Sequence, residues 1–423
     1  MILTIIYFIL ILGITVFVHE LGHFLFAKKF GVYVYEFSIG MGPRLFKFKR
    51  KNDETDYCIR LFPIGGFVQM AGEEVEVDTS IPEEKRLMSK PAYQRFLIMV
   101  AGVMNNFIFA FIVLFILGIF TNVSTDNIYV ADSIIPNLNT GDKITAIDGR
   151  FVNNYDKLSL EIIVSGDNSY TVTAKDKSGV KKDVVVNPIP VGKSNLIYKK
   201  DYGFSINIAD LSILETSRSD IKVGSKISKI NDVKVENHLG LMEELNKVGD
   251  NFNLTFVDES GLENSVSITA SEMEKDELVG YSYGYQVGGI EAKGILGALK
   301  FAFIKFFSTI EQMIFTVVYL ITGRISLGML SGPVGIFNAV GAYSKVGFAS
   351  IVSFLCLICI NVGFINLLPL PAFDGGHILF IIIEKIKGSR VNPKVENTIH
   401  NIGFILLMIL MVLITYNDII NLF

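Results

Sequence analysis

Cysteine and charge are both scarce in this chain of 423 residues. Its three cysteines, Cys58, Cys356 and Cys359, are too few to build a disulfide framework. The last two form a C-x-x-C pair inside an apolar run, where a buried thiol usually behaves as a small hydrophobic group, so a redox or metal role is the weaker interpretation. Charged residues make up only 19% of the chain, and no basic stretch is interleaved with aromatic residues. We therefore expect no nucleic-acid partner.

Apolar residues, by contrast, are abundant. Half of the chain is hydrophobic, 33 of its residues are phenylalanine, and its mean hydropathy is +0.46. This composition excludes an ordinary soluble enzyme. It indicates an integral membrane protein that also contains a soluble part. The first apolar segment lacks the basic start and the small-residue cleavage site of a signal peptide, so we expect it to remain in the mature protein.

Four apolar runs are long enough to cross a bilayer, whose core needs about 20 apolar residues. They are residues 1–27, 96–120, 349–368 and 401–420. Lysine and arginine cluster after the first run and again between the last two, whereas residues 121–140 contain neither. Because basic residues mark cytoplasmic loops, we expect residues 28–95 to lie in the cytoplasm and both termini to lie outside.

A fifth apolar segment, residues 296–322, contains Lys300, Lys305 and Glu311. Its polar residues recur at steps of three and four, which gathers them on one face, as in a helix that lies in the membrane interface. If this segment crossed the bilayer, the last basic loop would face outward, against the charge rule. We therefore predict four transmembrane helices and one interfacial amphipathic helix.

Residues 126–290 have the composition of short strands and turns. Two stretches within them, 138–158 and 221–241, repeat one pattern of glycine, polar residue, lysine, isoleucine, short strand, turn and helix. Both resemble PDZ domains, and the repeat predicts two tandem α+β domains, 126–208 and 209–290. PDZ domains bind extended peptides by strand addition. Whether these two bind peptides or act only as a size filter or scaffold stays open.

The motif H-E-L-G-H occupies residues 19–23, inside the first apolar run. Residues four apart share a helix face, so His19 and His23 can present two imidazoles to one metal ion while Glu20 projects beside them. Zinc suits two nitrogens and a carboxylate and leaves a fourth position open. Two hydrogen-bonded core histidines are the structural alternative, which is weaker because polar groups within a membrane span are costly and usually functional.

A third ligand is expected in residues 366–380, directly after the third apolar run. Asp374 offers a carboxylate next to two glycines, which permit close backbone approach. The first and third runs both point inward, so His19, His23 and Asp374 are all expected at the cytoplasmic side, where they can meet.

The other histidines are weaker candidates. His377 competes with Asp374 as the third ligand, but a histidine at this place is more often a hydrogen-bonding neighbour. His238 and His400 have no partner at motif spacing, and we interpret both as structural or solvated.

These residues resemble the site-2 proteases, a family of intramembrane zinc metalloproteases with H-E-x-x-H in the first core span and N-x-x-P-x-P-x-x-D-G in a later one. The second motif runs here from Asn366 to Gly375, with Phe373 in place of the usual leucine. The resemblance covers nearly the whole chain and is closest to the bacterial regulator-of-sigma-E subfamily. Further stretches that carry it are 65–73, 101–110, 330–336 and 384–388.

The resemblance implies roles for particular residues. It implies that His19, His23 and Asp374 bind Zn²⁺ and that Glu20 is the general base. It also implies a set of substrate-binding residues from the second motif and from the strand G-F-V-Q-M. They are Asn366, Pro369, Pro371, Gly66, Phe67, Val68, Gln69 and Met70.

The residues themselves support a substrate-binding strand. Strand-like segments separated by glycine and proline predict a small membrane-associated β-sheet in residues 28–95, with an edge strand at 66–70. A transmembrane helix has its backbone groups satisfied internally and must unwind before hydrolysis. A free sheet edge can accept the unwound segment as an added strand. A hairpin that only braces the helices is the alternative, because strand order is not visible in a sequence.

The expected fold is a polytopic α-helical membrane protein with four transmembrane helices, a cytoplasmic-side β-sheet and an extracytoplasmic insert of two tandem PDZ-like domains. We predict a bacterial cytoplasmic-membrane enzyme that contacts lipid and cleaves single-span membrane proteins, such as anti-sigma factors or signal-peptide remnants, already trimmed by another protease. A PDZ scaffold with a vestigial metal site is the alternative, which the intact ligand set disfavours. A metal-ion transporter ranks last, because the first run is apolar over most of its length.

Overall fold

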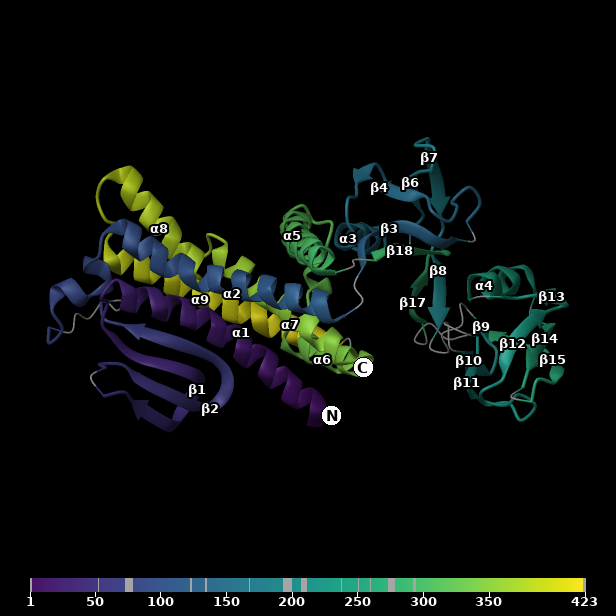
Figure 1. The fold of residues 1–423 in the computed structure, drawn as a ribbon, viewed down its shortest axis with the longest axis horizontal. Coiled ribbons are helices and arrows are strands. Elements are labelled where there is room, and N and C mark those ends of the chain that lie inside the picture. Colours follow the sequence, from purple (N-terminus) through teal and green to yellow (C-terminus); the bar gives the residue numbers. More distant parts are fainter. Residues whose placement is uncertain are drawn as a thin grey trace. The chain divides into compact units, whose positions relative to one another are not determined.

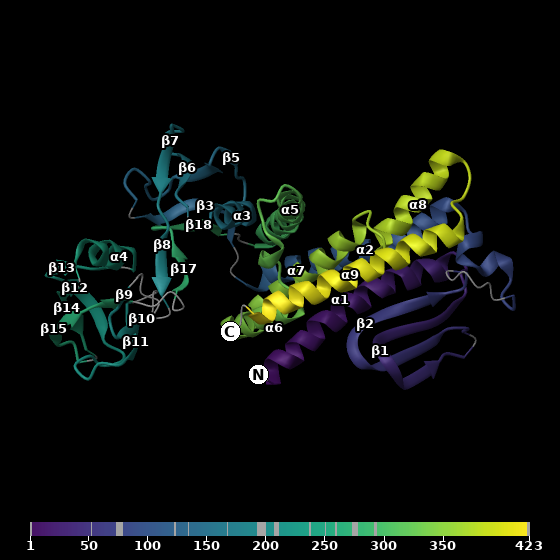
Figure 2. The same ribbon diagram turned by 180° about the vertical axis from the view of Figure 1, so that it is seen from behind.

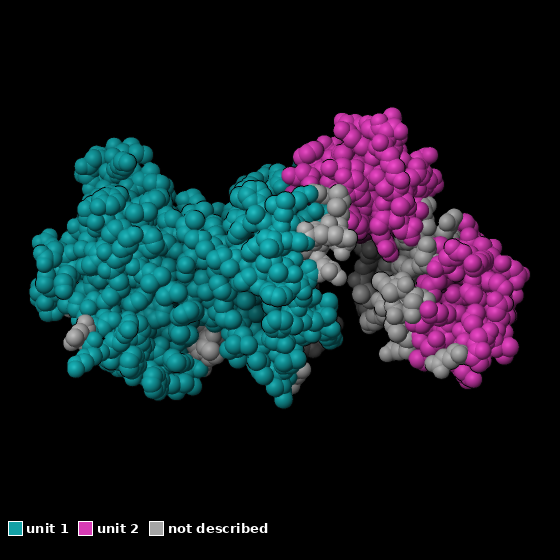
Figure 3. All heavy atoms as spheres, viewed as in Figure 1, with its two compact units in different colours: residues 1–125, 291–423 teal, residues 126–290 magenta. Residues whose placement is uncertain are grey.

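The fold is described from a computed structural model of the chain, which divides into two compact units (Figure 3). We call Met1–Thr125 with Glu291–Phe423 the membrane unit, and Asp126–Ile290 the insert. The insert has the bounds expected from the sequence. The described residues are 2–51, 53–72, 79–121, 124–133, 135–166, 168–192, 200–206, 211–236, 238–249, 251–258, 260–272, 278–291 and 294–420.

The described part of the membrane unit contains five helices that are long and apolar enough to cross a bilayer. They are α1 (Ile2–Lys29), α2 (Ala92–Phe120), α5 (Gly294–Ile321), α7 (Phe348–Leu367) and α9 (Pro393–Ile420). Two shorter helices, α6 (Pro333–Val346) and α8 (Asp374–Lys387), flank α7 in the chain. These helices are consistent with a membrane protein, and α1, α2, α7 and α9 contain the four runs predicted to span.

Helix α5 differs from the other long helices. It is seen end-on in Figures 1 and 2, while α1, α2 and α9 run across both views. It is also the least apolar of the five and packs on α2, where Gly118 lies against Ala298. This orientation favours an interfacial helix over a fifth span, and the count of four spans stays a prediction.

Small residues allow α1, α2 and α7 to approach closely, as is common between membrane helices. A Cβ atom at Gly22 of α1 would overlap the carbonyl of Ala101, and one at Gly363 of α7 would lie 2.7 Å from the Phe107 ring. All three cysteines are free and buried, and Cys359 Sγ lies 3.3 Å from Thr15 Oγ1 of α1. Cys356 and Cys359 therefore belong to the helix packing, as the sequence predicted, whereas Cys58 lies outside the helices.

Strands β1 (Val34–Lys49) and β2 (Asp56–Met70) form a bent antiparallel hairpin beside α1 (Figures 1 and 2). Because both strands bend, residues 34–39 pair with 66–70 on one side, and residues 36–39 pair with 56–59 on the other. Residues 44–49 pair with 56–60 at the far side. Residues 66–70 thus form the outer strand on one side of this small sheet.

The insert contains two hydrophobic cores under two sheets. The first sheet has the order β18-β3-β4-β6-β7, with β5 beside β4 and helix α3 (Tyr155–Ser165) after β5. Its strands are β3 (Ser124–Ser133), β4 (Lys143–Ile147), β5 (Arg150–Phe151), β6 (Tyr170–Lys175), β7 (Lys181–Val186) and β18 (Tyr285–Glu291).

The second sheet has the order β13-β12-β14-β15, and helix α4 (His238–Lys247) follows β13. Its strands are β12 (Lys226–Ile230), β13 (Val233–Lys234), β14 (Asn251–Val257) and β15 (Glu263–Thr269). Three two-stranded ribbons accompany it. They are β8 (Ile189–Gly192) with β17 (Leu278–Ser282), β9 (Lys200–Asp201) with β16 (Ser271–Glu272), and β10 (Phe204–Ile206) with β11 (Ile213–Thr216).

The repeat that the sequence predicted is present as two strand–turn–strand–helix segments. Both turns use residues with positive φ, Asp148 and Gly149 in the first and Asn231 and Asp232 in the second. Two consecutive residues of this kind favour a tight hairpin whose twist matches that of the strands. The likeness of each domain to PDZ stays a prediction.

The expected tandem order of 126–208 followed by 209–290 is wrong at its C-terminal end. Strand β18 joins the first sheet beside β3, and Tyr285 and Val287 pack against the first core. The second domain is therefore inserted within the first, and the ribbons β8–β17 and β9–β16 carry the chain out and back. A repeat shows where a strand–turn–helix unit recurs, but not which distant strand completes the sheet.

Candidate metal centre

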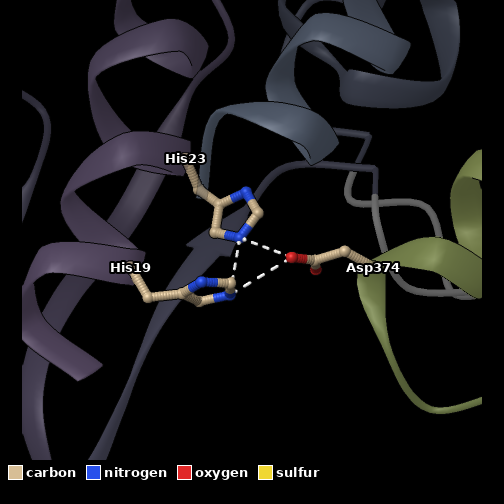
Figure 4. A group of neighbouring side chains, drawn as sticks. All are labelled: His19, His23 and Asp374. Atoms are coloured by element: carbon tan, nitrogen blue, oxygen red, sulfur yellow. Dashed lines mark hydrogen bonds and ion pairs between the residues drawn. The ribbon is translucent and has the colours of Figure 1, made fainter. Parts of the chain in front are cut away.

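Helix α1 presents two histidines on one face. His19 and His23 are 7% and 6% exposed, and their Nε2 atoms lie 3.2 Å apart with the rings at 81° (Figure 4). Their spacing of four residues brings the second ring one turn above the first, as expected for a helix. The H-E-L-G-H motif therefore forms a convergent pair of imidazoles.

Asp374, the first residue of α8, completes this set, which we call the α1–α8 group: His19, His23 and Asp374. Its Oδ2 atom lies 3.2 Å from Nε2 of His19 and 3.2 Å from Nε2 of His23 (Figure 4). Residues separated by about 350 positions in the sequence thus meet at one point. This meeting was predicted from the shared inward direction of the first and third apolar runs.

The chain reaches this point through a sharp change of direction after α7. Pro369 and Pro371 cannot continue a helix, and α7 accordingly ends at Leu367. At Gly375, a Cβ atom would overlap the carbonyl oxygens of Leu367 and Leu368. Only glycine therefore lets the first turn of α8 pack against the end of α7, which fixes where Asp374 projects.

The orientation of His23 is set by helix α2. Its Nδ1 donates to the carbonyl oxygen of Ile98 at 2.8 Å, so the hydrogen is on Nδ1 and Nε2 keeps its lone pair. Gly102 provides the space for this ring, since a Cβ atom there would overlap Nε2. A backbone carbonyl that accepts from the outer nitrogen is the usual support of a metal-binding histidine.

The α1–α8 group fits a zinc ion. Three ligand atoms about 2.0–2.2 Å from one tetrahedral ion lie roughly 3.3 Å from one another, close to the observed separations. The lone pair of His23 Nε2 faces a carboxylate oxygen, and within the described residues Asp374 Oδ2 is a buried atom with no hydrogen-bond donor. A cation between these atoms would replace this repulsion with three favourable contacts.

Glu20 lies between the α1–α8 group and the edge strand. Its carboxylate interacts electrostatically with His19, His23 and Asp374 and accepts a hydrogen bond from the backbone N–H of Val68. A Cβ atom at Gly66 would lie 3.5 Å from Cγ of Glu20. The strand of residues 66–70 is therefore next to the carboxylate that the motif predicts as a general base.

Ion pairs hold the hairpin behind this edge. Glu36, which is 2% exposed, receives Arg60 Nη2 at 2.7 Å and also pairs with Arg44. Burial alone would raise the pKa of Glu36, but the two guanidinium groups outweigh it and hold that pKa below its ordinary value. The Arg60 guanidinium also lies 5.0 Å above the ring of Phe67, so the same cation supports the edge strand.

The remaining predicted site residues lie around the same region. Asn366 donates its side-chain N–H to the carbonyl of Val362 within α7, at 2.9 Å. Pro371 packs against Gly403 of α9, and Pro369 is exposed.

In the edge strand, Val68 and Met70 are buried in the hydrophobic core, while Gln69 is exposed and Phe67 is half-buried. The substrate-binding role of these residues stays a prediction.

Sequence reasoning missed a second set of side chains, which we call the α8–α9 group: His377, Glu396 and His400. His377 does not join the α1–α8 group and lies 3.3 Å from Glu396 through its Nδ1. His400, for which the sequence offered no partner, is buried and accepts a hydrogen bond from the backbone of Ala372. The spacing of four between Glu396 and His400 on one helix was the available signal.

Comparison with known proteins agrees with this geometry. A family model described as peptidase family M50 matches residues 7–410. The putative zinc metalloprotease FN1322 of Fusobacterium nucleatum is 32% identical over 416 residues, which cover 98% of each chain. The zinc metalloprotease RasP of Shouchella clausii is 29% identical over 454 residues, covering 99% of each. The regulator of sigma-E protease RseP of Escherichia coli is 32% identical over 454 residues, covering 97% of each.

Proposed function

Because this chain belongs to peptidase family M50, the zinc-dependent site-2 proteases, we propose that it cleaves single-span membrane proteins within or beside their transmembrane segment. Membership of the family makes it a zinc metalloendopeptidase. The observation that carries the proposal is the convergence of His19, His23 and Asp374 on one point next to Glu20, which itself contacts the edge strand.

We assign the zinc ion to the α1–α8 group. His19 and His23 offer Nε2 atoms, and Asp374 offers Oδ2, which together form a ligand set of two nitrogens and one carboxylate with an open position. Bound there, zinc supplies a Lewis acid that polarises the scissile carbonyl and makes water acidic near neutral pH. The carbonyl of Ile98 keeps His23 in the tautomer that this role requires.

Glu20 is the proposed general base. It follows His19 directly in the chain, so its carboxylate lies at the side of the ligand set and can accept a proton from the attacking water. The same carboxylate can then return that proton to the amine that leaves. The hydrogen bond from Val68 holds Glu20 at the border between the ligand set and the edge strand.

Substrate is proposed to bind as an added strand on residues 66–70. These residues are the outer strand of the small sheet, and an outer strand can accept an unwound segment as a further strand. Pairing there would bring a scissile carbonyl next to Glu20. The segment that leads to Asp374 contains Asn366, Pro369 and Pro371. These residues are proposed to contact the bound substrate segment.

The topology is proposed to follow the charge rule. Four spans, both termini and the insert outside, and the site near the cytoplasmic face of the bacterial membrane form one consistent arrangement. The insert would then exclude or select substrates before they reach the site, and its domains would admit proteins already trimmed by another protease. Anti-sigma factors are a substrate class in keeping with the name of the Escherichia coli relative, regulator of sigma-E protease.

The test follows a tagged single-span substrate in membranes that contain the full chain. We expect Glu20→Gln to reduce the cleavage rate by about 10²–10⁴-fold, because it removes the base. Its zinc content should be unchanged, since Glu20 is not a ligand. Glu84→Gln is the matched control, because that glutamate is exposed and belongs to neither the α1–α8 group nor the α8–α9 group, and it should cleave like wild type. Cleavage at the wild-type rate by Glu20→Gln would refute the proposal.

A further inference from the structure

The α8–α9 group lies beside the loop that leads to Asp374. The rings of His377 and His400 are stacked, with centroids 3.9 Å apart and planes at 13°, and Nδ1 of His377 lies 3.3 Å from Oε1 of Glu396. Two histidines and a carboxylate within reach of one another suggest a second metal site at first sight.

The geometry excludes a shared ion at this place. A metal lies in the plane of each imidazole that binds it, and two nearly parallel planes 3.9 Å apart have no common point between the rings. Nδ1 of His400 accepts the backbone N–H of Ala372 at 3.1 Å, so the hydrogen of this neutral ring is on Nε2. Nε2 of His400 therefore has no lone pair to offer.

The hydrogen bond to Ala372 supports a strained residue. Ala372 has a φ of +76°, in the left-handed region that residues with a Cβ atom rarely adopt, and it precedes Asp374 by two residues. Such a conformation persists only where the surroundings fix it. Here the surroundings include His400, which is 8% exposed and so lies inside the fold.

Helix α9 holds this loop at two further points. A Cβ atom at Gly403 would overlap Pro371, so the proline lies directly on the helix backbone. A Cβ atom at Gly376, in the first turn of α8, would lie 3.0 Å from Cε1 of His400. The loop from Pro371 to Gly376 is thus held against one face of α9, with the His400 ring in its middle.

We propose that His400 is a positioning residue for the metal centre. It holds Ala372 in its left-handed conformation, which fixes the direction in which Asp374 projects toward His19 and His23. His377 stacks on the His400 ring, and Glu396 orients His377, so the α8–α9 group acts as one support. This inference rests on the proposed function only in taking Asp374 as a zinc ligand.

Two substitutions of His400 separate the acceptor from the ring. His400→Phe keeps a ring that can stack on His377 and removes the acceptor, whereas His400→Asn keeps an oxygen at the position of Nδ1 and removes the ring. Hydrogen–deuterium exchange of the metal-free full chain in detergent reports on the amide of Ala372 directly. We expect faster exchange in residues 368–376 of His400→Phe, by tenfold or more, and near wild-type exchange in His400→Asn.

The second measurement is zinc affinity, by competition with a chelator. Partners that orient a metal ligand typically contribute about 10–100-fold in metal affinity. We therefore expect His400→Phe to bind zinc at least tenfold more weakly. In the cleavage assay this variant should show a lower kcat and an unchanged KM. His400→Asn should restore most of the affinity. Gly403→Ala displaces Pro371 and leaves His400 intact. This variant should also bind zinc more weakly than wild type.

Each contrary result has a distinct meaning. Unchanged exchange and unchanged zinc affinity in a folded His400→Phe would overturn the proposal, as would equal losses in His400→Phe and His400→Asn. A wild-type chain that binds two zinc ions, one of which His400→Phe loses, would replace it with a second metal site. Failure of the proposed function would instead be seen as full cleavage by Glu20→Gln, which none of these measurements involves.

Discussion

The α1–α8 group and the α8–α9 group each combine two histidines with one carboxylate, and both include a residue from the first turn of α8. In the first group the rings stand at 81° and both Nε2 atoms lie 3.2 Å from one carboxylate oxygen. In the second group the rings stack at 13°, and the carboxylate reaches one ring only. The two groups therefore offer the same kinds of ligand atom, but the lone pairs converge on one point only in the α1–α8 group.

The difference begins at a single backbone hydrogen bond in each group. His23 Nδ1 donates to the carbonyl of Ile98, which leaves Nε2 free to bind a metal. His400 Nδ1 accepts from the N–H of Ala372, which puts the hydrogen on Nε2. The polarity of the backbone group behind a histidine thus decides whether its other nitrogen binds a metal or supports the fold.

Removing a carboxylate from each group should separate them most clearly. We expect Asp374→Ala to lose zinc and all measurable cleavage, because two imidazoles alone leave the ion with too few protein ligands. Glu396→Gln, the matched change in the α8–α9 group, should keep its zinc stoichiometry. Metal analysis of the purified full chains measures both. Full zinc retention in Asp374→Ala and in His23→Ala would contradict the assignment of zinc to the α1–α8 group. Loss of zinc in Glu396→Gln would show that the α8–α9 group also binds the ion.

A smaller change behind the α1–α8 group should have a smaller effect. In Gly102→Ala the new methyl group would overlap the His23 ring, so we expect zinc affinity to fall by about 10–100-fold. Overpacking should also lower the free energy of unfolding by about 1–3 kcal/mol. Chelator competition and thermal unfolding in detergent measure the two effects. Gly341→Ala in α6 is the control, because its Cβ atom would meet only Thr4 at 3.4 Å. Equal zinc affinity in both variants would show that Gly102 does not shape the site.

The sequence predicted the α1–α8 group because its signals are local. The spacing of His19 and His23 needs only one helix, and the motif around Asp374 combines prolines and glycines that end one helix and begin another. Basic residues near the ends of the apolar runs then indicated that both segments reach the same side of the membrane. These signals require no knowledge of how distant segments pack.

The features that the sequence did not reveal depend on contacts between distant segments. The partner of His400 is a backbone N–H, which every residue except proline carries, so no residue type at position 372 indicates it. Strand β18 joins β3 through backbone hydrogen bonds that are equally independent of residue type. For the same reason, the roles of Gly102 and Gly403 became visible only once the opposing side chain or backbone was located.

An ion pair that includes no zinc ligand gives the smallest expected effect on zinc. Glu384, near the other end of α8, accepts two hydrogen bonds from Arg95 of α2 at 2.6 and 2.7 Å. Burial alone would raise the pKa of Glu384, but the Arg95 guanidinium outweighs it and holds that pKa below its ordinary value of 4.5. The pair therefore stabilises the fold above the unfolded pKa near 4.5, and this contribution is lost as pH falls through the lower pKa of the folded state.

Glu384→Gln should consequently keep its zinc and lose stability in a manner that depends on pH. At neutral pH we expect the free energy of unfolding to fall by about 1–3 kcal/mol, because Arg95 stays largely buried without its charged partner. As pH falls below 4.5, the glutamate takes up a proton in the unfolded wild-type chain before it does so in the folded chain. The difference between the two chains should therefore shrink, and it should end once the folded glutamate is protonated too. Thermal unfolding in detergent at pH 7 and at pH 4, with Glu84→Gln as the exposed control, measures this difference. A zinc affinity as low as that of Gly102→Ala would instead show that the far end of α8, and not only the loop held by His400, sets the position of Asp374.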